Sequence, residues 1–166
     1  MTKNAANLWL ICLHVEMKNK IRGYKSYFVN YYLYCLNWLD LNNEEIVVLL
    51  NYLEKEGEGI AIQVEIHRVK SRIEELKGNY IKALNEINEA MDFVRQLDSP
   101  LYYMECKLSQ LRIELAMGHE KKRIMEQVEQ LEQEYVYRDN NLALFASVEN
   151  GIKFLKDKCS DVPNSF

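Results

Sequence analysis

The side chains of this 166-residue chain that could act as bases, nucleophiles or metal ligands are its three histidines, four cysteines and many carboxylates. Nucleophilic catalysis and metal binding need such residues at short, defined spacings. His14, His67 and His119 lie far apart, and the chain contains no Glu-x-x-His pair, no Cys-x-x-Cys pair and no Gly-rich phosphate-binding motif. We therefore predict no catalytic residues, no metal site and no cofactor, and we expect a protein that is not an enzyme.

The charged and thiol groups bear on the compartment of the protein and on the classes of partner that it binds. The net charge of −4 lacks the positive surplus that nucleic-acid binding needs. The cysteines at 12, 35, 106 and 159 are isolated, which favours reduced thiols in a cytoplasmic compartment. The apolar stretch 5–13 is followed at once by His14 and Glu16, and no stretch reaches the roughly 20 apolar residues of a membrane span. We expect a cytoplasmic protein that binds neither nucleic acid nor a membrane.

Aromatic residues are concentrated between Tyr24 and Trp38, and they surround too much of a helix for one buried stripe. Two interpretations stay open. The segment is either sandwiched between neighbouring helices, which we favour, or part of it, including Tyr32, lines a binding surface, for which tyrosine is well suited.

These side chains must be positioned by helices, because the chain has only six Gly and two Pro and its apolar residues recur at helical spacing. Ile62, Ile66, Val69, Ile73 and Leu76 form one such stripe. Breakers at Gly23, Gly57, Gly59, Gly78, Pro100 and Gly118 divide the chain into segments of about twenty residues. The pattern predicts an all-α fold of eight helices: 4–21, 24–40, 43–56, 60–77, 79–97, 100–117, 120–138 and 141–158.

The helix junctions carry recognisable end signals. Gly78 and Gly118 lie where a left-handed residue would end a helix, and connections this short allow only antiparallel neighbours. Ser99 before Pro100 is typical of a helix start, with the serine oxygen accepting an exposed backbone N–H.

An internal repeat appears when the chain is shifted by forty residues. The segment Arg72–Gly78 then aligns with Arg112–Gly118, and Glu65 aligns with Glu105. A weaker copy precedes them, so the helix pairs 24–56, 60–97 and 100–138 predict a stacked helical array, flanked by helices 4–21 and 141–158. Residues 1–158 are expected to form one domain, with 159–166 as a loose tail.

The segment 64–97 resembles a tetratricopeptide repeat (TPR). Ser71, the Gly78-Asn79-Tyr80 turn, Ala83 and Ala90 appear in the family's order and spacing, although His67 replaces the usual large or aromatic residue. The resemblance implies a short right-handed array of antiparallel helix hairpins. It also implies a concave face, lined by the first helix of each pair, that binds a protein or peptide.

The groove positions implied by the family fall on Glu65, Arg68, Arg72, Glu75 and Leu76, and the shift of forty adds a second set. That set is Glu105, Leu108, Arg112, Leu115 and Ala116. Arg72 and Arg112 then repeat on one face, where they could hold acidic side chains or the C-terminus of a bound peptide. The alternative, which we weigh equally, is that each arginine pairs with a glutamate of its own array, such as Glu75 or Glu105.

The function expected from these features is a non-enzymatic binding module, an adaptor or a chaperone-like protein. Two alternatives remain open. One is a regulatory sensor or peptide receptor that acts through a partner chain, and the other is a structural subunit of a larger assembly, including a homo-oligomer.

Overall fold

The computed structural model describes residues 47, 50–51, 53–55, 59–136 and 142–160, and these residues form helices and short connections without a strand. The helices are α4 (Ile60–Leu76), α5 (Tyr80–Val94), α6 (Pro100–Ala116), α7 (Lys121–Val136) and α8 (Leu142–Cys159). The all-α prediction is therefore confirmed for the described part of the chain. Tyr32 and the predicted helices 4–21 and 24–40 lie outside it, so the count of eight helices stays a prediction.

The two predicted glycine turns have the same construction. Gly78 and Gly118 adopt left-handed φ values of 79° and 86°. The N–H of Asn79 bonds to the carbonyl of Glu74 at 2.8 Å, and the N–H of His119 bonds to that of Glu114 at 3.1 Å. These bonds close the ends of α4 and α6 in the Schellman arrangement, which requires a residue without a Cβ penalty at positive φ.

The boundaries of the described helices differ from the predicted ones by up to three residues. Helix α5 ends at Val94 instead of 97, because the N–H groups of Gln96 and Leu97 bond three residues back and the chain turns toward Ser99. Ser99 is extended, as a residue before proline prefers, but its side chain makes no capping hydrogen bond. Cys159, predicted as the start of the tail, is instead the buried last residue of α8.

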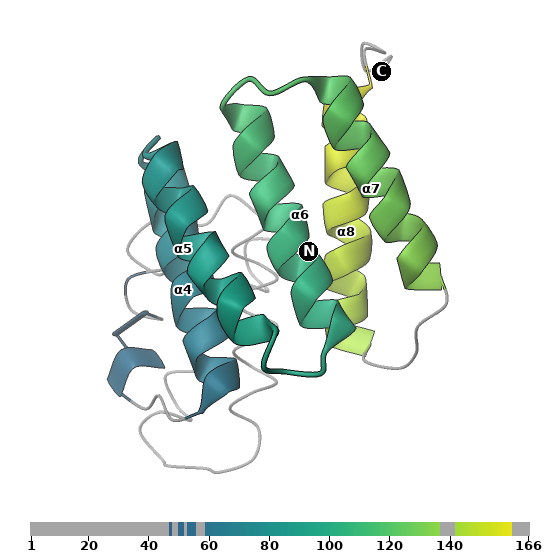
Figure 1. Cartoon of the computed structure of the whole chain (residues 1–166). Coiled ribbons are helices and arrows are strands. Elements are labelled where there is room, and N and C mark those ends of the chain that lie inside the picture. Colours follow the sequence, from purple (N-terminus) through teal and green to yellow (C-terminus); the bar gives the residue numbers. More distant parts are fainter. Residues whose placement is uncertain (1–46, 48–49, 52, 56–58, 137–141, 161–166) are drawn as a thin grey trace, which may run out of the picture.

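Helices α6, α7 and α8 share one hydrophobic core. Helix α8 packs against both α6 and α7, in keeping with Figure 1. The fully buried members of this core include Leu108, Leu111, Ile124, Val128 and Leu155. This half of the molecule is held by apolar burial.

Helices α4 and α5 form an antiparallel hairpin that packs closely. Ser71, Ala83 and Ala90 are buried, and the Ser71 hydroxyl donates to the Ala83 carbonyl at 2.8 Å. The hairpin meets α6 through a smaller cluster in which Val64, Ile87 and Val94 contact Cys106. None of the described helices is long and apolar enough to cross a membrane.

Candidate functional site

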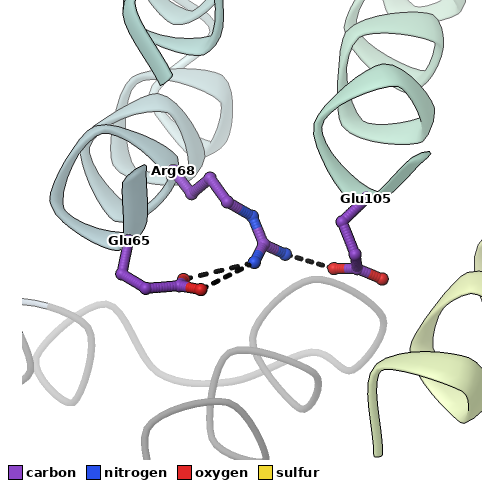
Figure 2. Close-up of polar contacts among 3 residues, drawn as sticks. All are labelled: Glu65, Arg68 and Glu105. Carbon is purple, nitrogen blue, oxygen red and sulfur yellow. Dashed lines mark hydrogen bonds and ion pairs between the residues drawn. The ribbon is translucent and has the colours of Figure 1, made fainter. Parts of the chain in front are cut away.

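A buried arginine lies between two carboxylates where α4 faces α6. Figure 2 shows Arg68 of α4 between Glu65 of the same helix and Glu105 of α6. Nη1 of Arg68 donates to both carboxylate oxygens of Glu65 at 3.2 Å, and Nη2 donates to Oε2 of Glu105. All three side chains are at most 3% exposed. The arginine thus joins two helices through a fully buried ion cluster.

Burial and charge pull the protonation states of this cluster in different directions. Burial raises the pKa of Glu65 to about 7, although Arg68 and a hydrogen bond with Tyr102 act to lower it. Burial also acts to lower the pKa of Arg68, but Glu65 and Glu105 raise it above its ordinary value, so the guanidinium stays charged. The neighbouring Cys106 thiol stays protonated because burial raises its pKa to about 12. A permanent cation therefore lies beside a carboxyl group that titrates near neutral pH.

A second ion cluster joins the same two helices further along. Arg112 of α6 binds Glu75 of α4 through two parallel hydrogen bonds, Nε to Oε1 at 2.7 Å and Nη2 to Oε2 at 2.8 Å. Arg72 reaches the same carboxylate, with Nη1 lying 3.0 Å from Oε1. Burial acts to raise the pKa of Glu75, but the two arginines together lower it by more, so its pKa lies below the ordinary value. One ionised carboxylate therefore serves two arginines.

The two clusters follow one register. Arg68 and Glu105 are 37 residues apart, and so are Glu75 and Arg112. Equivalent positions of the repeat are forty residues apart, so Glu105 is equivalent to Glu65 and Arg112 to Arg72. Each of these α6 residues therefore pairs with the α4 residue that follows its equivalent by three positions. Residues seven apart lie on the same helix face, and the same register brings Ser109 level with Arg72. We call these residues the α4–α6 ladder: Glu65, Arg68, Arg72, Glu75, Glu105, Ser109 and Arg112.

Three polar atoms of the ladder lack a hydrogen-bond partner although they are buried. They are Nε of Arg68, Oε1 of Glu105 and Oγ of Ser109. Nearly all buried polar atoms in native proteins are paired, so a concentration of unpaired ones on one face needs an explanation. The set contains a donor, an acceptor and a hydroxyl that can do either.

The structure brings four of the predicted site residues together and places a fifth, Leu108, elsewhere. Arg68, Arg72, Glu75 and Arg112 all belong to the ladder, in the arrangement where arginines pair with glutamates of their own chain. Leu108 is fully buried in the core of α6, α7 and α8, so its role is packing. Tyr32 lies outside the described residues.

Sequence reasoning missed Ser109. Its signal is a serine in the interior of α6, four residues after Glu105 and therefore on the same helix face. A serine whose hydroxyl makes no bond to its own helix is unusual in a helix interior.

His67 lies outside the ladder and is engaged in packing. His67 stacks on Phe93 with ring centroids 5.6 Å apart, and its Nδ1 lies 2.7 Å from Oε2 of Glu86. Among the described residues, no group of three or more His, Cys, Asp or Glu is arranged to hold a metal ion.

Comparison of the chain with protein-family models, with curated proteins and with solved structures gives no match.

Proposed function

We propose that this chain is a non-enzymatic protein- or peptide-binding module, an adaptor or chaperone-like protein built as a TPR-like array. Two features support the array. The turns at Gly78 and Gly118 have the same construction forty residues apart. The small residues Ser71, Ala83 and Ala90 are buried where α4 and α5 pack closely.

The observation that carries the binding role is the set of unpaired buried atoms in the α4–α6 ladder. A polypeptide backbone offers one N–H and one C=O per residue. The acceptor at Glu105 and the donor at Arg68 complement such a pair, and Ser109 can serve either group. A partner segment that enters between α4 and α6 would therefore meet hydrogen-bonding capacity that the chain itself leaves unused.

The charge of the ladder indicates the chemistry of the partner. Arg72 and Arg112 share the single carboxylate of Glu75. Guanidinium groups bind carboxylates through paired hydrogen bonds, so an acidic side chain or a free C-terminus is the kind of group that this pair of arginines would attract. A segment that enters between α4 and α6 would displace the ion pairs that join these two helices.

Ser109→Ala tests this role with little risk of unfolding. In the unbound chain the substitution removes an unsatisfied buried hydroxyl, so we expect stability to stay constant or rise by about 1 kcal/mol. If a partner bonds to the hydroxyl, affinity should fall about five- to tenfold. The probe is a set of peptides selected on the full chain from a random-sequence display library, with affinity measured by fluorescence anisotropy.

Ser71→Ala is the matched control. Its hydroxyl bonds to Ala83 inside the hairpin, so its loss should lower the free energy of unfolding by about 1 kcal/mol and leave affinity unchanged. Bound peptide should also slow hydrogen exchange in residues 60–117. Selection of no peptide, or equal affinity for the Ser109→Ala and wild-type chains, contradicts the proposal.

A further inference from the structure

Both glycine turns lie at the same end of the molecule. Helices α4 and α6 run parallel, so the ends of both and the starts of α5 and α7 lie together, at the top of Figure 1. A shallow cleft of ≈ 580 Å³ lies between the two turns, lined from Gly78 to Lys82 on one side and by Ala116 and Met117 on the other. We call this surface the turn-end cleft. It is distinct from the α4–α6 ladder, which lies along the helices.

Two large apolar side chains at the turn-end cleft are exposed to solvent. Ile81, in its wall, is 63% exposed, and Leu76, at the end of α4, is 41% exposed. Leaving a large branched side chain in water forgoes the free energy of its burial. Exposed apolar side chains that line a hollow are typical of docking surfaces.

Three lysines lie at or beside the cleft, in a chain whose net charge is −4. Lys82 lines it, and Lys77 and Lys122 are exposed beside the two turns. The carboxylates at this end are partly engaged, since Glu74 lies 3.2 Å from Lys77 and Glu114 lies 3.5 Å from Arg123. A binding partner would thus meet an apolar hollow with a basic rim.

We propose that the turn-end cleft docks an acidic segment of another protein, with one apolar side chain of that segment against Ile81. Charge complementarity selects this occupant: carboxylates would pair with the lysines while the apolar side chain fills the hollow. A second copy fits less well, because a two-fold symmetric contact would bring two basic rims together. The contact is small and partly electrostatic, so it is expected to be weak and sensitive to salt.

The test uses the full chain and a fluorescent peptide of about ten residues in which glutamates and serines flank one leucine. Amide chemical shifts of Ile81, Lys82 and Met117 should move on titration. Ile81→Ser and Lys82→Glu should each weaken binding about tenfold or more, and raising salt from about 50 to about 500 mM should weaken it further. Both substitutions change exposed side chains and should leave the fold intact.

Matched controls lie at the opposite end of the helices. Tyr103, which is 40% exposed, and Arg95 carry the same two chemical characters there, so Tyr103→Ser and Arg95→Glu should leave binding unchanged. Peptides with lysine in place of glutamate, or serine in place of leucine, should not bind. Ser109→Ala should also have no effect, so failure of this proposal and failure of the ladder's binding role are told apart.

Three outcomes overturn the proposal. The first is unchanged affinity in Ile81→Ser. The second is equal binding of the lysine peptide. The third is movement of the same amides with protein concentration alone, which would make a second copy of the chain the occupant.

Discussion

The surroundings of Glu65 act on its charge in opposite directions. It is 2% exposed, and its neighbours are Arg68, which favours ionisation, and Glu105, which opposes it. Removal from water dominates, and the resulting pKa of about 7 means that Glu65 carries a proton over part of the physiological pH range. The ladder is therefore tuned by proton concentration at this one position.

The free energy of unfolding should fall as pH rises from 4.5 to about 7. In this interval the folded chain keeps the Glu65 proton and the unfolded chain, with a pKa of 4.5, releases it. One proton gives a slope of at most about 1.4 kcal/mol per pH unit. Glu65→Gln mimics the protonated form and should flatten this slope and stabilise the chain at about pH 8, as measured by urea unfolding.

Glu74→Gln is the control for this prediction. Glu74 is partly exposed, and its hydrogen bonds with Asn79 and Lys77 lower its pKa, so its contribution to stability is lost only below pH 4.5. The slope between pH 4.5 and 7 should be the same in this variant as in the wild type. An unchanged slope in Glu65→Gln would mean that Glu65 is ionised throughout the interval.

At the scale of elements, the ladder fixes how α4 sits against α6. Both inter-helix pairs obey the same offset of 37 residues. A slip of α6 by seven positions would bring Arg68 level with Arg112 and so place like charges together. Buried ion pairs contribute little net stability but penalise wrong pairings strongly, so the ladder acts chiefly on register.

Substitutions of Glu75 and of Arg112 should lower the free energy of unfolding by different amounts, although these residues bind each other. Glu75→Gln removes the carboxylate that buried Arg112 and partly buried Arg72 both bind, and it should lower the free energy of unfolding by about 3 kcal/mol. Arg112→Met should cost less than half of that, because Glu75 keeps Arg72. In the exposed Asp92–Arg95 pair, Arg95→Met should change stability by less than about 0.5 kcal/mol. Equal losses for Glu75→Gln and Arg112→Met in urea unfolding would show that Arg72 does not share the carboxylate.

Helices and turns could be predicted from the sequence because both depend on local chemistry. Apolar periodicity identifies helices α4 to α8. Gly78 and Gly118 mark the turns because ending a helix in this way needs a positive φ, which glycine adopts without strain. The pairing of the arginines depends on the offset between two helices, which no local pattern encodes. Arg72 and Arg112 were thus identified as residues of one face, while the sequence left open whether they meet a partner or their own glutamates.

The described helices form two parts, one with an apolar core and one joined to it through polar as well as apolar contacts. Helices α6, α7 and α8 enclose an apolar core. The α4–α5 hairpin joins them through the ladder and through a cluster to which α6 contributes Cys106 and Tyr102. The contact changes from polar to apolar because equivalent positions of the repeat have different residue types. Arg68 and Glu75 face α6, whereas their equivalents on α6, Leu108 and Leu115, pack in the core shared with α8.

The α4–α5 hairpin should therefore open before the rest of the described array. In stacked repeats, stability is approximately a sum of the stability of each unit and of its contacts with neighbours, so the unit with the more polar contact separates at lower free energy. Native-state hydrogen exchange in low urea should show α4 and α5 exchanging as one group, ahead of α6, α7 and α8. Glu75→Gln should lower the opening free energy of the first group by the amount it removes from the ladder, with little change in the protection of α7 and α8. Both parts depend on the ladder for their relative position but not for their own cores. If the amides of α4 to α8 all exchanged with one common opening free energy, this division would be wrong.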